Sequence, residues 1–220
     1  MCQFFSAVIV DKGKKVLWLP DSDSHADILE HYKIKDTELK PNFVKIEFIP
    51  PEYTEKAFKD LSSWKLKIDQ DCLPDWFTKI ENHRHGVEQA ASAFIKERVF
   101  FEGRRLVTNG RYFAFDSSTV WAYGSSTVRA FDSSAVWAYG SSAVWAYDSS
   151  TVRAYGSATV WAYDFSTVRA YGSSTIKASD SSTVWAYDSS TVRAYSSSTI
   201  IWPNKSLINI PKRYKVDYHE

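Results

Sequence analysis

An eight-residue repeat runs from about Thr108 to Pro203 and restricts this chain to a stacked, repetitive architecture. One unit, called an octad below, is Asp116-Ser-Ser-Thr-Val-Trp-Ala-Tyr123, and the next is Gly124-Ser-Ser-Thr-Val-Arg-Ala-Phe131. Val, Thr, Tyr and Trp favour strands, whereas Gly-Ser and Asp-Ser pairs favour turns. Each octad therefore predicts one strand and one tight turn, and consecutive octads predict a parallel β-solenoid.

The even period predicts that each place of the octad, numbered 1 (Asp or Gly) to 8 (Tyr or Phe), keeps one orientation. Place 6 holds Trp, Arg or Lys, and an unpaired charge is too costly to bury in a narrow core. We therefore expect places 4, 6 and 8 to point outward, and the small residues at places 3, 5 and 7 to pack inside. The expected binding surface consists of Trp121, Arg129, Trp137, Trp145, Arg153, Trp161, Arg169, Lys177, Trp185 and Arg193 at place 6, with Tyr147 and Tyr163 at place 8.

The alternation of Asp and Gly at place 1, from Asp116 to Asp180, favours a coil of two strands and 16 residues. Its two turns would then differ, and only one would need the positive φ that favours glycine. A three-sided coil of 24 residues is the alternative, because place 6 also shows a period of three octads, with Trp137, Trp161 and Trp185 in one column. We favour the two-sided coil.

The octads resemble the octapeptide half-coils of bacterial ice-nucleation proteins, in units such as Tyr123-Gly-Ser-Ser-Thr-Val-Arg-Ala130. The resemblance covers the repeat region only and implies a two-sided solenoid. Ice binding in that family is associated with flat Thr-x-Thr ladders. Here the residue two places after Thr119 is Trp121, and elsewhere it is mostly Trp, Arg or Lys, so the flat threonine surface is absent and ice binding is not expected.

Residues 1–107 predict a small α+β head domain, and residues 204–220 predict a C-terminal cap or tail. Both are expected to cover the ends of the stack, where unpaired strand edges invite aggregation. The head is expected to contain a hairpin of Phe4–Val10 and Lys15–Leu19, a helix capped by Ser24, strands at Phe43–Ile49 and Trp64–Ile68, and a helix from Pro74 to about Glu97 with a break near Gly86. Val99–Phe101 and Leu106–Val107 would lead into the first coil, and Ser206–Ile210 would form a last strand.

Three segments of the head resemble the head domains of uncharacterised small phage and prophage proteins that carry similar repeats. They are Met1-Cys-Gln-Phe-Phe-Ser-Ala7, Asp23-Ser-His25 and Pro74-Asp-Trp-Phe77. The resemblance implies an origin in a mobile genetic element and assigns no activity.

Composition excludes several classes of protein. The formal net charge of +1 gives no global basic field for nucleic acid. Two cysteines provide no disulfide framework and indicate a reducing compartment. The apolar run Phe4–Val10 is too short to span a membrane and has no basic leader, so we expect a cytoplasmic protein without a membrane partner. Motifs for nucleotides, zinc or a nucleophile elbow are missing, so no cofactor is expected.

Three groups of residues carry weak chemical signals. If Met1 is removed, Cys2 becomes an N-terminal cysteine, the layout of class II glutamine amidotransferases, although Gln3 replaces their usual glycine. His83 and His85 have a spacing that binds metal on a strand, but a helix would separate them. His25 lies near Asp21 and Asp23, which predicts either a proton-transfer pair or a capping loop.

The sequence thus leaves three hypotheses for function. The first is a rigid, non-catalytic rod that binds a protein or polymer, including a host macromolecule inhibited by a phage product. Single-stranded nucleic acid is a special case of this hypothesis, since bases stack on aromatic side chains, but the aspartates at place 1 oppose it. The second is a homodimer or filament formed through the aromatic face. The third is an enzyme that uses Cys2, with the solenoid as an accessory module.

Overall fold

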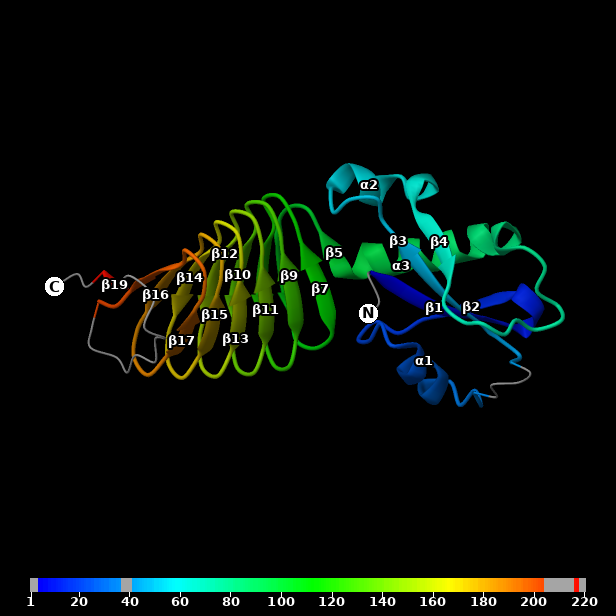
Figure 1. Cartoon of the computed structure of the whole chain (residues 1–220), viewed down its shortest axis with the longest axis horizontal. Helices are drawn as coiled ribbons and strands as arrows, with labels where there is room; N and C mark the ends of the chain where they lie inside the picture. Colours follow the sequence, from blue (N-terminus) through cyan, green and yellow to red (C-terminus); the bar gives the residue numbers. More distant parts are fainter. Residues whose placement is uncertain (1–3, 37–40, 204–215, 218–220) are drawn as a thin grey trace. The chain divides into compact units, whose positions relative to one another are not determined.

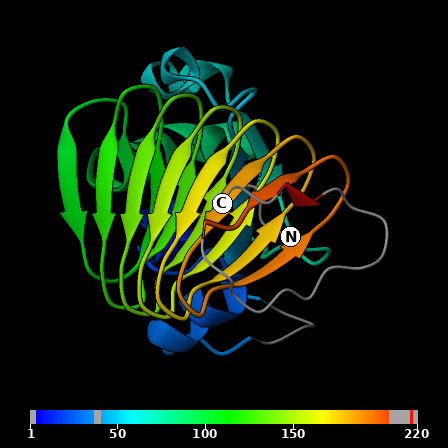
Figure 2. The same ribbon diagram turned by 90° about the vertical axis from the view of Figure 1, so that its left-hand side faces the viewer.

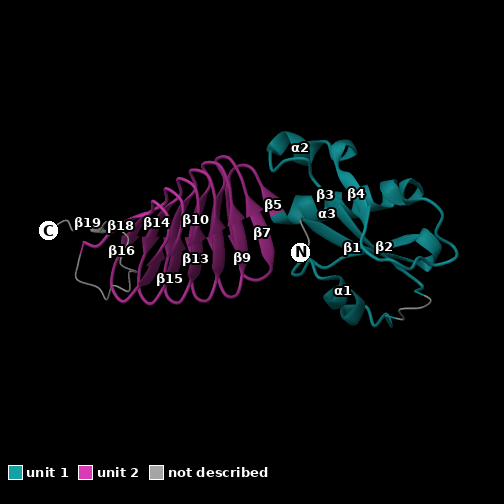
Figure 3. Ribbon diagram, viewed as in Figure 1, with its two compact units in different colours: residues 1–98 teal, residues 99–220 magenta. Residues whose placement is uncertain are grey.

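The structure, a computed structural model, describes residues 4–36, 41–203 and 216–217. The chain divides into two units, residues 1–98 and 99–220 (Figure 3). The expected boundary at 107 lies after β5 and β6, two strands that pair with the solenoid strands β7 and β8. No helix among the described residues is long and apolar enough to cross a membrane.

The first unit is a four-stranded antiparallel sheet with helices on both faces, in the strand order β2-β1-β3-β4. Its central strand β1 is buried on both faces. Val8 packs with Ile28 of α1 on one face, and on the other the ring centroids of Phe5 and Phe94 of α3 are 5.6 Å apart. The elements are β1 (Phe5–Val10), η1 (Asp11–Gly13), β2 (Lys15–Leu17), α1 (His25–His31), β3 (Val44–Ile49), α2 (Glu55–Lys59), η2 (Leu61–Ser63), β4 (Lys65–Ile68), η3 (Ile80–His83) and α3 (Arg84–Arg98).

The hairpin, the capped helix and the two later strands of this unit are confirmed. The Ser24 hydroxyl accepts a hydrogen bond from the Asp27 amide, which caps α1. The helix expected from Pro74 was wrong in its first part, because Pro74–Lys79 forms a turn and α3 begins at Arg84. The turn is closed by a hydrogen bond from the Phe77 amide to the Pro74 carbonyl, and Gly86 lies inside the helix without breaking it.

The second unit is a parallel β-solenoid with two strands in each coil, so the two-sided coil is confirmed (Figure 1). Consecutive strands of one sheet pair 16 residues apart, as in Val136 with Val152, and run side by side in one direction (Figure 2). The eight-stranded sheet has the order β19-β18-β16-β14-β12-β10-β8-β6, and the seven-stranded sheet has the order β17-β15-β13-β11-β9-β7-β5. Each strand is called a rung of its sheet below.

The strands of the eight-stranded sheet are β6 (Arg104–Val107), β8 (Thr119–Ala122), β10 (Ala135–Ala138), β12 (Thr151–Ala154), β14 (Thr167–Ala170), β16 (Thr183–Ala186), β18 (Thr199–Ile201) and β19 (Val216–Asp217). Those of the seven-stranded sheet are β5 (Val99–Phe100), β7 (Arg111–Ala114), β9 (Thr127–Ala130), β11 (Ala143–Ala146), β13 (Thr159–Ala162), β15 (Thr175–Ala178) and β17 (Thr191–Ala194). In the tail, Val216 pairs with Ile200, whereas the strand expected at 206–210 lies outside the described residues.

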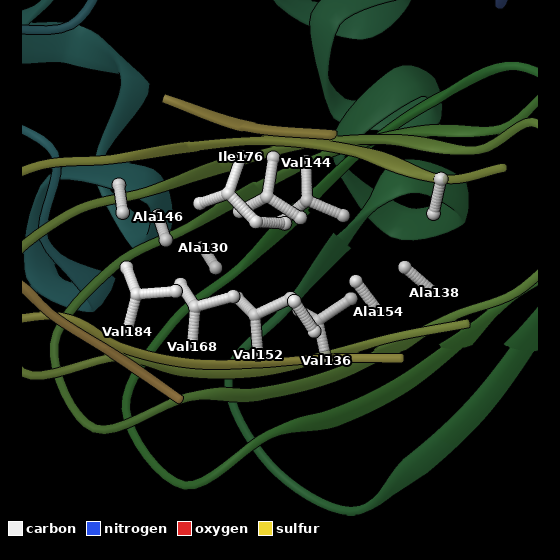
Figure 4. Packing of buried hydrophobic residues seen from close by; sticks show 14 of the residues in the cluster. Ala130, Val136, Ala138, Val144, Ala146, Val152, Ala154, Val168, Ile176 and Val184 are labelled. Carbon is white, nitrogen blue, oxygen red and sulfur yellow. The ribbon is translucent and has the colours of Figure 1, made fainter. Parts of the chain in front are cut away.

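The solenoid core consists of rows of valine and alanine that face each other across the two sheets. Figure 4 shows Val136, Val152 and Val168 in one layer and Val144 and Ile176 in the opposite layer. From Asp116 onward, the side chains at places 5 and 7 are almost completely buried, whereas those at places 4 and 6 retain exposure, which confirms the predicted inward and outward places there. In the preceding octad, Arg111 and Phe113, at places 4 and 6, are buried instead.

The alternation of Asp and Gly predicted that only one of the two turns needs a positive φ. That prediction was wrong, because both turns of the coil have a positive φ. Gly140 has φ 63° and Asp132 has φ 54°, and Asp188 occupies the glycine column with φ 53°. Aspartate tolerates this conformation when its short side chain finds a hydrogen bond nearby. The Asp148 carboxylate accepts one from the Asp132 amide of the preceding coil at 3.3 Å. Only Gly124 is strictly required, because a Cβ there would lie 2.6 Å from the Thr108 carbonyl oxygen.

Two internal rows of serine hydroxyls are buried at place 3. Nine of these hydroxyls have no hydrogen-bond partner among the described residues, whereas the Ser198 hydroxyl donates to the Tyr195 carbonyl oxygen at 2.8 Å. The octad with Ala158 shows that the hydroxyl is dispensable. A buried hydroxyl without a partner costs about 1–3 kcal/mol. The unpartnered hydroxyls are those of Ser118, Ser126, Ser134, Ser142, Ser150, Ser166, Ser174, Ser182 and Ser190.

We predict that Ser150→Ala raises the free energy of unfolding by about 1 kcal/mol, because it removes an unsatisfied hydroxyl and leaves the coil intact. The reverse change, Ala158→Ser, is the matched control and should lower it by a similar amount. Urea unfolding followed by circular dichroism measures both. A destabilised Ser150→Ala variant would show that these hydroxyls have partners in solution.

Candidate binding surface

The outward side chains of the solenoid form stacked rows on both sheets, because like residues lie opposite each other in the pairing register. The place-6 row of the eight-stranded sheet is Leu106, Trp121, Trp137, Arg153, Arg169, Trp185 and Ile201. The place-6 row of the seven-stranded sheet is Phe113, Arg129, Trp145, Trp161, Lys177 and Arg193. The ten residues predicted at place 6 therefore divide evenly between two faces.

The place-8 residues form two further rows, one along each turn edge. The row beside the glycine turns is an unbroken stack of Tyr123, Tyr139, Tyr155, Tyr171 and Tyr187, with ring centroids 4.7–5.0 Å apart. The row beside the aspartate turns contains the predicted Tyr147 and Tyr163, whose centroids are 5.2 Å apart. The predicted stacks are confirmed, and the row beside the aspartate turns continues from Tyr147 through Phe131 and Phe115 to Phe101.

The rings in these rows present their edges to solvent. Trp121 and Trp137 stack at 5.3 Å with 16° between their planes, and Trp145 and Trp161 stack at 4.4 Å with 7°. Parallel rings at these distances must overlap face to face, because rings side by side in one plane would clash. Each ring therefore covers the face of its neighbour, and its edge is the part that a partner can reach.

The cations of place 6 complete the same stacks. The Arg153 guanidinium lies 5.5 Å from the Trp137 ring centroid, and the Lys177 ammonium lies 5.5 Å from that of Trp161. Arg129 is similarly placed over Phe113 at 5.8 Å. Such contacts are worth about 0.5–1 kcal/mol at exposed sites and hold the cation in one position.

A shallow groove follows the eight-stranded sheet between its place-6 and place-8 rows. It is lined by Leu106, Trp121, Tyr123, Trp137, Tyr139, Arg153 and Tyr155. Burial raises the pKa of the Tyr139 phenol, helped by the neighbouring Tyr123 and Tyr155 and opposed by Arg153. The Tyr139 phenol is therefore neutral at physiological pH and available as a hydrogen-bond donor.

The enzymatic candidates in the head have other partners or are not described. Cys2 lies outside the described residues. His83 stacks on the Phe77 ring at 5.2 Å, while His85 contacts the Gln89 amide nitrogen at 3.0 Å. Among the described residues, no cluster of three His, Cys, Asp or Glu side chains has the geometry of a metal site. The two histidines therefore contact different neighbours.

His25 is the first residue of α1, and of its two expected roles the capping loop fits the structure, because the preceding Ser24 caps this helix. Its Nδ1 atom lies 3.2 Å from the Asp69 carboxylate, and its Nε2 atom lies 3.0 Å from the Ile46 carbonyl oxygen. The side chain is only 8% exposed. Both ring nitrogens are thus engaged in fixing α1 against the sheet, and sequence distance hid Asp69 as the partner.

Comparisons with known protein families, curated proteins and solved structures found no match for this chain.

We predict that lowering the pH towards about 4 stabilises the solenoid through Asp132. Burial, and then the charges of Asp116 and Asp148, raise the pKa of Asp132, while a hydrogen bond from the Asp116 amide opposes the shift. The folded chain then binds this proton more tightly than the unfolded chain. The stabilisation is complete below the unfolded pKa of about 4 and is lost as the pH rises through the folded value.

Asp132→Asn keeps a side chain that tolerates positive φ and removes the charge, so its melting temperature should depend less on pH between 4 and 7. Thermal unfolding of both proteins across this range measures the difference. Identical pH dependence in the two proteins would contradict the role assigned to Asp132.

Proposed function

We propose that this chain is a non-catalytic binding protein whose solenoid presents rows of aromatic and cationic side chains to a protein or polymer partner. The observation that carries the proposal is the stacking of Trp, Tyr and Arg in register along both outer faces. Trp, Tyr and Arg are enriched among residues that dominate binding energy. Side chains already held by their neighbours lose little conformational entropy when a partner arrives.

The sequence resemblances guide the choice of partner. The likeness of the octads to ice-nucleation coils supports a scaffold, and that of the head to phage and prophage proteins makes a host macromolecule the first partner to test. A low cysteine content, with Cys72 free and exposed, supports action in the reducing environment of a cytoplasm.

Matched double variants test the proposal. Binders selected from a peptide library on the full chain should bind at least about tenfold more weakly to Trp121→Ala with Trp137→Ala, or to Trp145→Ala with Trp161→Ala. The pair that weakens binding identifies the sheet that is used. Ser133→Ala with Ser149→Ala, on the exposed turns, is the control and should bind normally. If neither tryptophan pair changes binding while circular dichroism shows an intact fold, the proposal is wrong.

A second copy of the chain is the second candidate partner, and the order of one row favours it. Along the eight-stranded sheet, the row Trp121, Trp137, Arg153, Arg169 reads in reverse as two cations followed by two aromatic residues. A two-fold axis between the second and third of these rungs would place each arginine opposite a tryptophan of the other copy. Such an antiparallel dimer avoids contact between like charges.

For this dimer, light scattering should show a mass that rises with protein concentration. Exchanging one residue of each half, with Trp137→Arg and Arg169→Trp, would place arginine opposite arginine and tryptophan opposite tryptophan across the axis, and should return the mass to that of one chain. Trp145→Arg with Lys177→Trp makes the matched exchange on the other sheet. A mass equal to one chain at all concentrations would rule the dimer out.

A further inference from the structure

The charges of the solenoid are separated by position. Its octads carry aspartate only in the turns, at place 1, whereas the arginines and the lysine lie at place 6 on the faces. The outward places of the octads, 4, 6 and 8, contain no Asp or Glu. Each face therefore carries cations without a carboxylate beside them.

Two cations are adjacent on the eight-stranded sheet. Arg153 pairs with Arg169 in the strand register, so their Cα atoms lie about 4.8 Å apart. Both side chains are half-buried, and neither forms a salt bridge or a side-chain hydrogen bond within the described residues. Their mutual repulsion is thus uncompensated by any acidic group of the described chain.

The surroundings of this pair consist of hydrogen-bond donors and aromatic edges. Trp137 precedes the pair and Trp185 follows it along the row. The stacked Tyr155 and Tyr171, with centroids 5.0 Å apart, lie at place 8 of the same two octads. Because the edge of an aromatic ring is electropositive, every group that faces outward around the pair favours a negatively charged ligand.

We propose that Arg153 and Arg169 bind a phosphate monoester, carried by a phosphorylated segment of a protein partner. The inference rests on the proposed binding function and names the chemistry of the partner. A phosphate monoester carries a charge of about −1.5 to −2 at pH 7 and three acceptor oxygens, enough to engage two guanidinium groups. A carboxylate carries one charge and is satisfied by one guanidinium. Trp137 holds Arg153 in place, so the site is partly preorganised.

The extent of the site favours a phosphorylated polypeptide over a nucleic acid. The cation pair is only two rungs long and is bounded by tryptophan on both sides. A strand with a phosphate on every nucleotide would meet neutral ring edges beyond the pair. Its bases would also lack stacking platforms, because the ring faces already cover one another. The groove that ends at Arg153 and Tyr155 offers space for the chain beside a single phosphate.

The test uses the full chain and two fluorescent pools of short random peptides, one with a central phosphotyrosine and one with tyrosine. Anisotropy should show binding of the phosphorylated pool only, and inorganic phosphate should compete. Arg153→Gln and Arg169→Gln should each weaken binding at least about tenfold, the loss expected for a charge-assisted contact. Arg169→Lys should bind with intermediate affinity, and Ser133→Ala with Ser149→Ala, on the exposed turns, should leave binding unchanged.

Three results would overturn the inference: equal binding of both pools, unchanged binding by the Arg153→Gln and Arg169→Gln variants, or tighter binding of a short single-stranded DNA than of the phosphopeptides. Circular dichroism of each variant excludes misfolding, and Arg169→Lys keeps the test valid if a Gln variant unfolds. Library binders that lose affinity in the tryptophan variants but keep it in both arginine variants would leave the binding function standing and reject only the phosphate site.

Discussion

The pairing of each strand with the strand 16 residues away is the constraint on which the rest of the solenoid depends. Backbone hydrogen bonds of 2.8–2.9 Å, such as that from the Tyr139 amide to the Ala122 carbonyl, join the coils, and the turns are joined as well. In this register every side chain lies on its own equivalent. Valine packs on valine and serine on serine, and tyrosine rings stack for the same reason. The same register places Arg153 beside Arg169, and packing does not offset the repulsion between their charges.

Most of this architecture follows from the sequence, because the residue types at each place of the octad indicate which places face outward. Trp, Arg and Lys share place 6, so that place had to be outside, and parity then decided the remaining places. The turns could not be read in the same way. The glycines indicated a positive φ in one of the two turns, but the aspartates of the other turn adopt a positive φ as well. The hydrogen bond made by the aspartate carboxylate reaches the adjacent coil, 16 residues away, so neighbouring residues do not reveal it.

The irregular head illustrates where sequence reasoning stops. Local signals placed the hairpin and the cap at Ser24, since both depend on residues a few positions apart. The partner of His25 is Asp69, on the far side of β3 and β4 in the sequence, and no local pattern connects them. The start of α3 was also missed. Trp76 and Phe77 pack around His83, and this contact between aromatic rings holds the preceding segment in a turn.

The orientation of the rings changes what the aromatic rows are able to bind. From the sequence, Trp and Tyr beside Arg suggest stacking platforms for nucleic-acid bases. In the structure the faces are used within the rows, so a partner meets ring edges, hydroxyl groups and guanidinium groups. A surface of this kind distinguishes acceptors from donors more than it distinguishes one planar ligand from another.

The net charge of +1 therefore conceals the feature that matters most for recognition. The octads from Asp116 to Pro203 contain six aspartates, all in turns, and five cations, all on faces. Because ionic interactions in water fade over about 8–10 Å, a ligand on a face senses the nearest cations more strongly than the overall balance. The acidic turns then act against any polyanion long enough to reach past the face, whereas a single anionic group remains within the field of the cations. Under the proposed function, charge separation on a repeating scaffold would thus favour a localised anion, even though the chain as a whole is almost neutral.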